Sequence, residues 1–286
     1  MHARSALFDV YGDHLRARGG RAPVAALVRM VRPLGVTAPA VRTAISRMVR
    51  QGWLEPVRLE EGPGYALTAR ATARLDEAAT RIYRTRASTW DGAWDLLVLA
   101  PAGSRSVRDR VRSQLAFLGY GQLSDSTWIG PTRSPEVEEL LAGEQLEASR
   151  FEARDDDPAQ RARRAWDLQT LAAAYDSWHT RARGLVEDPA VILGRGALEA
   201  MGPDERAFAV RSLLVHEWRL FLFTDPGLPA ELLPERWPGH AAARFFAEQA
   251  RRLAPAASRF VDACLAGDER ATPDRTELAV PDPGKR

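Results

Sequence analysis

Apolar residues recur at helical spacing three times in the first fifty residues, which predicts three short helices. The first stripe ends at a pair of glycines and consists of Leu7, Val10, Tyr11 and Leu15. The second lies between two prolines and consists of Val24, Leu27, Val28 and Val31. The third follows Thr37 and consists of Val41, Ala44, Ile45, Met48 and Val49. Thr37 is of a type that caps helices by accepting a backbone N–H, so we expect it to begin the third helix.

The third predicted helix carries polar side chains on the face opposite its apolar stripe. They are Arg42, Thr43, Ser46, Arg47 and Arg50. Such side chains bind base edges and phosphates when a helix lies in a major groove. A polar stripe is more often a solvated face, so its interpretation depends on the neighbouring segment of the chain.

A β-hairpin is predicted directly after this helix. The extended run contains Trp53, Leu54, Val57 and Leu59, "EEGPG" supplies turn residues, and "YALT" returns. Three helices followed by a two-stranded wing is the order of a winged helix-turn-helix, predicted here over residues 1–68. Arg58 lies beside the turn, where we expect it to hold a backbone phosphate. Thr68 would then cap a connector helix over residues 69–90.

The rest of the chain predicts two further domains and a tail. Residues 91–156 show the pattern β-α-β-(β)-α-β, beginning at "WDLLVLAP", which indicates a ferredoxin-like domain. Helical periodicity over 157–267 predicts an all-α domain for an effector or for dimerisation. Residues 268–286 contain three prolines and few apolar residues, so we expect disorder there. The predicted fold class is therefore α+β with several domains.

Charge is distributed unevenly along the chain, although the net charge is only +2. Residues 1–90 contain 15 arginines and 7 acidic residues, a net charge of +8. The remaining residues contain 25 basic and 31 acidic side chains, a net charge of −6. This asymmetry indicates a polyanionic partner for the N-terminal third, and nucleic acid is the leading candidate.

Composition argues against several other classes of protein. Cys264 is the only cysteine, which excludes an intrachain disulfide and a cysteine-based metal site. "HEWRL" lacks the second histidine of a zinc protease motif, and no "GxSxG" elbow is present. We therefore expect no metal, no cofactor and no catalysis. The N-terminus lacks the apolar stretch of a signal peptide and no run is long enough for a membrane span, so we expect a cytoplasmic protein without membrane attachment.

Four ordered stretches resemble the PaaX family of bacterial repressors of phenylacetate degradation operons. They are "SALFDVYGD", "VRTAISRMVRQGWL" with "YALT", "RDRVRSQLAFLGYGQLSDSTWIGP", and "HEWRLFLFTDPGLPAELLPERWPG". The resemblance implies a homodimer that binds double-stranded DNA at a palindromic operator. It also implies release from DNA by an aryl- or acyl-coenzyme A thioester such as phenylacetyl-coenzyme A.

The effector would need an aromatic wall for its acyl group and arginines for its phosphates. The candidates in the C-terminal block are His216, Trp218, Arg219 and Trp237. An equally simple interpretation is that "HEWR" forms a buried polar cluster that supports the following loop.

Two other functions remain open from the sequence. The central domain resembles the small ferredoxin-like nuclease of CRISPR spacer acquisition, in which a carboxylate at the end of the first strand supports metal-dependent cleavage. Here that strand ends in "VLAPAG", and Asp95 lies at its start, so we expect the nuclease activity to be lost. The second alternative is an adaptor that binds protein through its C-terminal helices without specific DNA recognition.

Overall fold

The computed structural model describes residues 1–82, 90–101 and 104–267. The chain divides into two compact units. The first contains Met1–Ala79, Arg183–His216 and the described residues from Gln249 on, and the second contains Thr80–Ala182 and Glu217–Glu248. The tail expected to be disordered and residues 83–89 of the expected connector helix lie outside the described residues, and Trp90, where that helix is expected to end, is not helical.

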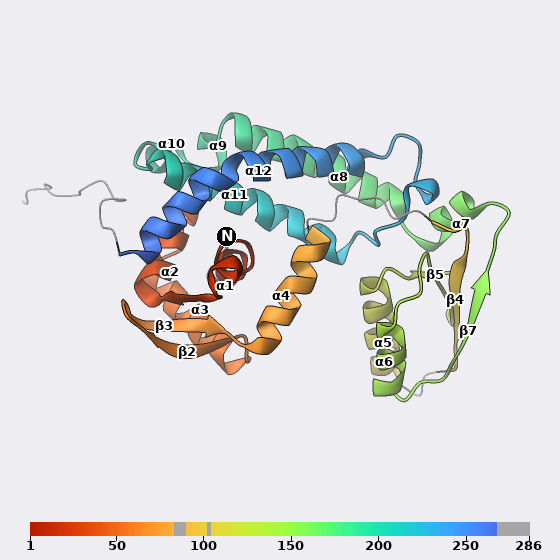
Figure 1. Cartoon of the computed structure of the whole chain (residues 1–286). Helices are drawn as coiled ribbons and strands as arrows, with labels where there is room; N and C mark the ends of the chain where they lie inside the picture. Colours follow the sequence, from red (N-terminus) through yellow and green to blue (C-terminus); the bar gives the residue numbers. More distant parts are fainter. Residues whose placement is uncertain (83–89, 102–103, 268–286) are drawn as a thin grey trace, which may run out of the picture. The chain divides into compact units, whose positions relative to one another are not determined.

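The first unit begins with helical segments and a small antiparallel sheet. These N-terminal elements are α1 (Ala3–Asp9), η1 (Val10–Leu15), η2 (Arg16–Arg18), β1 (Arg21–Pro23), α2 (Val24–Val31), η3 (Arg32–Leu34), α3 (Ala38–Arg50), β2 (Leu54–Leu59), β3 (Gly62–Leu67) and α4 (Ala69–Ile82). Figure 1 shows α1 nearly end-on, with α2, α3 and the β2–β3 hairpin around it. The three helical stripes and the hairpin therefore fold in the order that the sequence predicts.

The first of these helices changes its hydrogen bonding halfway along. Apolar spacing predicts one helix through Leu15, whereas the α-helix ends at Asp9 and a π-helix continues it. π-Helical turns accommodate an extra residue and occur often at functional sites. Asp9 and His14 are buried here, although the sequence pattern is that of an apolar stripe.

The hairpin is joined by a third strand that the sequence pattern does not predict. Strand β3 lies between β1 and β2 and is antiparallel to both. The turn contains only Glu60 and Glu61, so the return strand begins at Gly62, earlier than the expected "YALT". A Cβ on Gly64 would lie 2.6 Å from the carbonyl oxygen of Ala22. Glycine at this position therefore allows β1 to approach β3 closely.

The C-terminal part of the described chain contains helices and connecting loops. They are α7 (Pro158–Ala165), α8 (Leu168–Glu187), α9 (Ala190–Leu193), α10 (Arg195–Glu199), α11 (Pro203–Trp218), η4 (Arg219–Phe223), η5 (Ala230–Leu232) and α12 (Pro238–Leu265). Helix α12 continues through Pro255, where the missing N–H leaves one backbone carbonyl without its helical donor.

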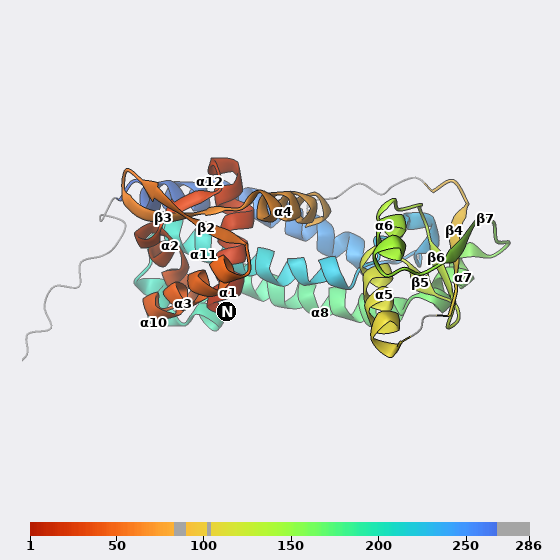
Figure 2. The ribbon, with the colours of Figure 1, turned by 90° about the horizontal axis from the view of Figure 1, so that it is seen from below.

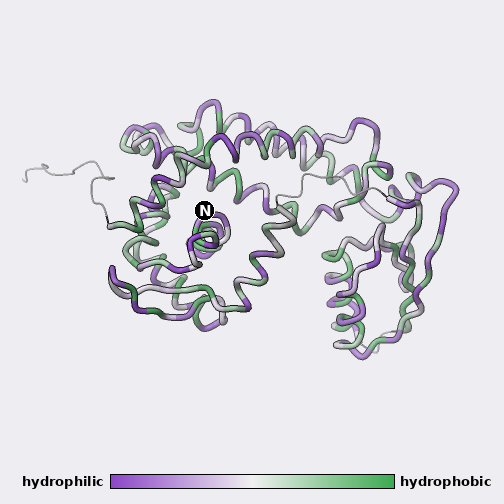
Figure 3. Tube along the Cα trace, viewed as in Figure 1, coloured by the Kyte–Doolittle hydropathy of each residue, from purple (hydrophilic) through white to green (hydrophobic). Residues whose placement is uncertain are grey.

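Helices from both ends of the sequence share the apolar core of the first unit. The N-terminal helices contribute Leu7, Leu27 and Met48, and α11 and α12 contribute Phe208 and Phe260. Figure 3 shows hydrophobic and hydrophilic residues alternating along these helices, as expected for amphipathic elements. The basic N-terminal segment is therefore packed directly against helices that lie almost 200 residues later in the chain.

The second unit contains the expected βαββαβ arrangement. Its elements are β4 (Trp94–Leu99), α5 (Arg105–Phe117), β5 (Gly121–Gln122), β6 (Thr127–Gly130), α6 (Glu136–Gly143) and β7 (Ala148–Ala153). The strand order is β5-β6-β4-β7, and all neighbouring strands are antiparallel. Figures 1 and 2 show α5 and α6 together on one face of this sheet. Leu97, Trp128 and Leu115 fill the space beneath the helices.

Candidate nucleic-acid interface

Helix α3 separates its apolar and polar side chains as the sequence predicts. Its inner face is buried and consists of Val41, Ala44, Ile45 and Met48. Its outer face is exposed and consists of Arg42, Thr43, Ser46, Arg47 and Arg50. The helix therefore presents three guanidinium groups and two hydroxyl-bearing side chains to solvent, and the Thr43 hydroxyl donates back to the helix, to the Pro39 carbonyl oxygen.

The start of α3 differs from the expected capping arrangement. Thr37 occupies the N-cap position with extended backbone, but its side chain makes no capping hydrogen bond. Pro39 lacks an N–H, but amides in the first turn of a helix have no intrahelical acceptor, so no hydrogen bond is lost. Gly35, which precedes the helix, adopts a left-handed φ of +75°. Backbone geometry therefore begins the helix here, and the exposed Thr37 hydroxyl is not committed to a cap.

Trp53 anchors the hairpin beside the C-terminal end of α3. Its ring meets Phe8 edge-on at a centroid distance of 4.7 Å, and the guanidinium of Arg74 lies 5.8 Å from it. The Trp53 amide donates to the Met48 carbonyl oxygen at 2.9 Å. Arg58 is exposed in β2, opposite Pro63 and next to the turn. The hairpin arginine is thus carried on an element fixed directly to α3.

Arginines of the N-terminal segment differ in whether they have a partner within the fold. Arg18 donates to Asp262 at 2.8 Å, Arg32 donates to Glu205 at 2.9 Å, and Arg29 donates to the carbonyl of Cys264. These three side chains fasten the N-terminal helices to α11 and α12. Arg16 donates to Asp76 of α4 at 2.8 Å. In the part of the chain that the structure describes, Arg42, Arg47, Arg50 and Arg58 form no hydrogen bond or ion pair, and neither do Arg21 of β1 and Arg70 of α4.

These contacts show which positive charges of the N-terminal segment remain available to a partner. Part of the positive charge of residues 1–90 is neutralised inside the unit, whereas the predicted binding face keeps all of its charge. A guanidinium that is exposed to water can remain unpaired at little cost in free energy. It can form bidentate hydrogen bonds when an anion binds. The outer face of α3 and the hairpin arginine therefore form a candidate interface for phosphates and base edges.

The first unit also contains a buried polar contact at one predicted effector residue. His216, at the end of α11, lies with Nδ1 2.8 Å from a carboxylate oxygen of Asp9 in α1. The side chain of Asp9 is 3% exposed. His216 is therefore engaged by a residue of its own unit, and that partner lies in α1 and not in the loop that follows "HEWR".

The other three predicted effector residues belong to the second unit, where an aromatic cluster surrounds Tyr175. Trp218 stacks on Phe246 with a centroid distance of 4.7 Å, and Trp237 meets Tyr175 edge-on at 6.0 Å. Arg219 directly follows Trp218 and is half-buried. Tyr175 donates to Asp225, and burial raises its pKa. These aromatic rings are buried against one another, and Arg219 belongs to the same unit.

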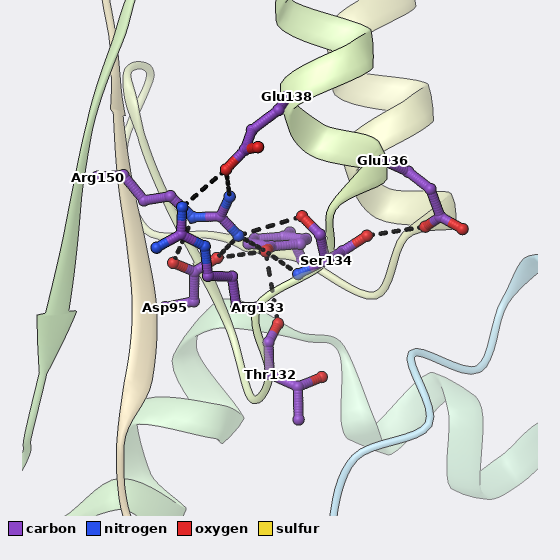
Figure 4. Close-up of polar contacts among 8 residues, drawn as sticks. Asp95, Thr132, Arg133, Ser134, Glu136, Glu138 and Arg150 are labelled. Atoms are coloured by element: carbon purple, nitrogen blue, oxygen red, sulfur yellow. Dashed lines mark hydrogen bonds and ion pairs between the residues drawn. The ribbon is translucent and has the colours of Figure 1, made fainter.

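Asp95, the carboxylate considered for nuclease chemistry, is fully engaged by its neighbours (Figure 4). Its two oxygens accept hydrogen bonds from Nε and Nη2 of Arg150 at 2.7 and 2.6 Å. The Tyr120 hydroxyl also donates to Asp95, and burial raises the pKa of this phenol to about 12. Arg150 further donates to the Ser134 carbonyl and to Glu138. The network stabilises the charge of Asp95 within the fold.

The described residues contain no cluster typical of a metal site and no single helix typical of a membrane span. Within residues 1–82, 90–101 and 104–267, no group of three histidine, cysteine or acidic side chains is arranged to hold a metal ion. No single helix in those ranges has the length and apolar character to cross a membrane. One bent pair, Val24–Leu34 with Ala38–Arg50, passes that test when its members are counted together across a 119° bend.

Sequence reasoning missed the polar residues that hold α1 and η1 against α11. Asp13 pairs with Arg211, and Asp9 contacts His216. The available signal was the spacing of Asp9 and Asp13, which are four residues apart within an apolar helical stripe. Acidic residues at core-facing spacing imply basic partners elsewhere, but the sequence does not say which ones.

A helix with an exposed basic face, joined to a hairpin that carries another arginine, is the arrangement of a nucleic-acid-binding protein. Comparison with known families places this chain among the PaaX-like proteins, and it belongs to that family. The family model of the PaaX-like protein matches residues 2–71, that of the PaaX central Cas2-like domain matches 87–165, and that of the PaaX-like C-terminal domain matches 166–263.

Two relatives extend this comparison over most of the chain. The transcriptional repressor PaaX of Escherichia coli (strain K12) is 34% identical over 266 residues, covering 90% of this chain and 82% of the relative. The solved structure of the uncharacterized protein Rv0674 from Mycobacterium tuberculosis is 26% identical, with a TM-score of 0.60. That match covers 92% of this chain and 98% of the other. The similarity therefore extends over both units.

Proposed function

We propose that this chain is a transcriptional repressor that binds double-stranded DNA through a winged helix-turn-helix at its N-terminus. The observation that carries the proposal is the set of arginines on α3 and the hairpin that have no partner among the described residues. The similarity to a transcriptional repressor supports it. In this proposal the protein binds DNA and catalyses no reaction.

In this proposal α3 lies in the major groove. Arg42, Thr43, Ser46 and Arg47 contact base edges, because side chains on this face reach the groove floor. Arg50 and Arg58 hold phosphates on either side. Thr37 holds a further phosphate, since its exposed hydroxyl and the free amides of the first turn point to the same end of the helix.

The protein acts as a homodimer on a palindromic operator. Two copies related by a twofold axis present two α3 helices to successive turns of the duplex, so half-site centres are about 10 base pairs apart or a multiple of that. The mass of the protein–DNA complex by analytical ultracentrifugation tests this point. One copy per palindrome at saturation contradicts the dimer.

The main experiment selects duplexes from a random library with full-length protein and then measures competition against random DNA. We expect a recurrent palindrome and a specificity ratio of about 10³ or more. The variant Arg42→Ala/Arg47→Ala should lose that preference, whereas Arg195→Ala, which removes an exposed guanidinium in α10, should not. A ratio near one for the natural chain identifies the adaptor alternative instead.

An acyl-coenzyme A thioester, with phenylacetyl-coenzyme A as the leading member, releases the repressor from DNA. Trp218, Trp237 and Tyr175 lie in the same unit as Arg219 and support this assignment, because an acyl thioester needs both apolar contacts and a phosphate-binding group. The ligand must bind the DNA-incompetent state more tightly to shift the equilibrium. A gel-shift titration with a panel of thioesters tests it, and no change with any member rejects the effector class alone.

A further inference from the structure

Thr43 is exposed on the outer face of α3, yet its hydroxyl group is already used within the helix. Its Oγ1 donates a hydrogen bond to the carbonyl oxygen of Pro39 at 3.0 Å, one turn earlier. Serine and threonine commonly bond back to the helix in this way. A hydroxyl has only one proton to donate, so Thr43 has no donor left for a base.

Besides the lone pairs of this oxygen, the threonine side chain has one other group to present. Its Cβ carries a hydroxyl and a methyl, and the oxygen is turned back towards the helix backbone. The methyl group is the substituent left facing outward. Ser46, one turn further along the same face, makes no hydrogen bond to other described residues. The face therefore presents an apolar methyl at Thr43 and an uncommitted hydroxyl at Ser46.

Among the four bases, thymine offers an apolar group in the major groove, its C5-methyl, and threonine methyl groups contact it. We propose that Thr43 selects thymine in the bound DNA through methyl–methyl contact and not through a hydrogen bond. The inference rests on the proposed function, because it requires α3 to lie in the major groove. Arg42 precedes Thr43, and arginine pairs best with guanine. Each half-site therefore contains a thymine within about two base pairs of a guanine.

The test uses the duplex that the full-length protein selects from a random library. Each thymine is replaced singly by deoxyuridine, which removes only the C5-methyl. We expect one position per half-site at which binding weakens about fourfold. A buried methyl contributes about 0.8 kcal/mol, and about 1.4 kcal/mol corresponds to a tenfold change in affinity. Other thymines should tolerate the replacement.

Two variants of Thr43 separate its methyl from its hydroxyl. Thr43→Val keeps a methyl and loses the hydroxyl, so it should remain sensitive to deoxyuridine at the same position. Thr43→Ser keeps the hydroxyl and loses the methyl, so it should bind about fourfold more weakly and no longer distinguish thymine from deoxyuridine. Ser46→Ala is the control, because it should leave the deoxyuridine effect unchanged.

The opposite pattern overturns the inference. If Thr43→Val loses the preference and Thr43→Ser keeps it, the hydroxyl is the recognition group. If no thymine is sensitive to deoxyuridine, methyl recognition is absent, although specific selection by the natural chain still supports the repressor. If the library yields no preferred sequence, both the inference and the proposed function fail.

Discussion

Asp13 and Arg211, which are 198 residues apart, form a bidentate ion pair in the core of the first unit. The two carboxylate oxygens of Asp13 accept from Nε and Nη2 of Arg211 at 2.8 and 2.7 Å, and both side chains are at most 10% exposed. Arg211 also donates through Nη1 to the carbonyl of Ala250 in α12. One guanidinium thus joins the π-helical segment η1 to both C-terminal helices that pack against it.

Breaking this pair should destabilise the first unit strongly. Asp13→Asn removes the carboxylate that binds a buried guanidinium in bidentate fashion, which costs about 3–5 kcal/mol of unfolding free energy. Replacing both partners, as in Asp13→Leu/Arg211→Met, should cost less than the single change because no unpaired charge remains. Urea unfolding followed by circular dichroism measures the free energies. Equal losses in the single and double variants contradict the argument, and Arg259→Ala at the exposed Asp204 pair is the control.

His14 should make the stability of the first unit depend on pH. Burial, the largest cause, lowers the pKa of His14 to about 4 from a model-peptide value of 6.5. Its ring lies against Phe208, with Asp13 at 3.4 Å and the charges of Arg211 and Arg18 nearby. Between pH 6.5 and 4 the unfolded chain binds more protons than the folded one, so the unfolding free energy falls as the pH falls.

This loss should amount to about 3 kcal/mol between pH 6.5 and 4, because each unit of pKa difference is worth about 1.4 kcal/mol. In His14→Gln the pH dependence in that window should be smaller by a similar amount. Urea midpoints at half-unit steps of pH provide the measurement. Parallel curves for the two proteins show that His14 does not cause the dependence.

Arginines assigned to bases and to phosphates should respond differently to salt. Arg42→Ala should cost about 1–3 kcal/mol on the selected duplex and relax preference at one base pair. Arg58→Ala should weaken binding to every sequence alike and reduce the slope of log affinity against log salt by about 0.9. Fluorescence anisotropy at four salt concentrations distinguishes the two. A sequence-dependent loss in Arg58→Ala moves this arginine into the base-reading group.

Arg150 should be essential for the stability of the ferredoxin-like domain. Arg150→Met leaves Asp95, which is 9% exposed, without its bidentate partner. We expect a loss of about 3–5 kcal/mol, reduced in Asp95→Leu/Arg150→Met. Arg133→Met, which removes a largely exposed guanidinium, should leave the unfolding midpoint unchanged. A large effect of Arg133→Met and a small one of Arg150→Met would reverse the assignment.

Gly64 should not tolerate a side chain. A Cβ there would meet the Ala22 carbonyl oxygen at 2.6 Å and the Leu59 side chain at the same distance, so Gly64→Ala should cost about 1–3 kcal/mol through overpacking. Gly143, at the end of α6, has open space around it, so Gly143→Ala should be neutral or stabilising by up to about 1 kcal/mol. Thermal unfolding compares the two. A stable Gly64→Ala shows that β1 can move away from β3.

The amphipathic helices and the βαββαβ order were predictable because their signals are local. A buried face at spacing 3.6 and a strand bounded by proline and glycine depend on neighbouring residues alone. The exposed face of α3 follows from the same periodicity, and all five of its polar residues lie outside as predicted. The candidate site was therefore predictable in its main part.

Residues distant in the chain decided the rest. Strand β1 exists because Gly64 of β3 leaves room for it, and three residues carry too little pattern to predict. Arg18, Arg29 and Arg32 look like the arginines of α3 in sequence, and only the fold shows that they pair with α11 and α12. Local periodicity thus determined which side chains face outward on each helix. Tertiary packing decided which charges remain available, because an ion pair depends on partners that the order of the sequence does not reveal.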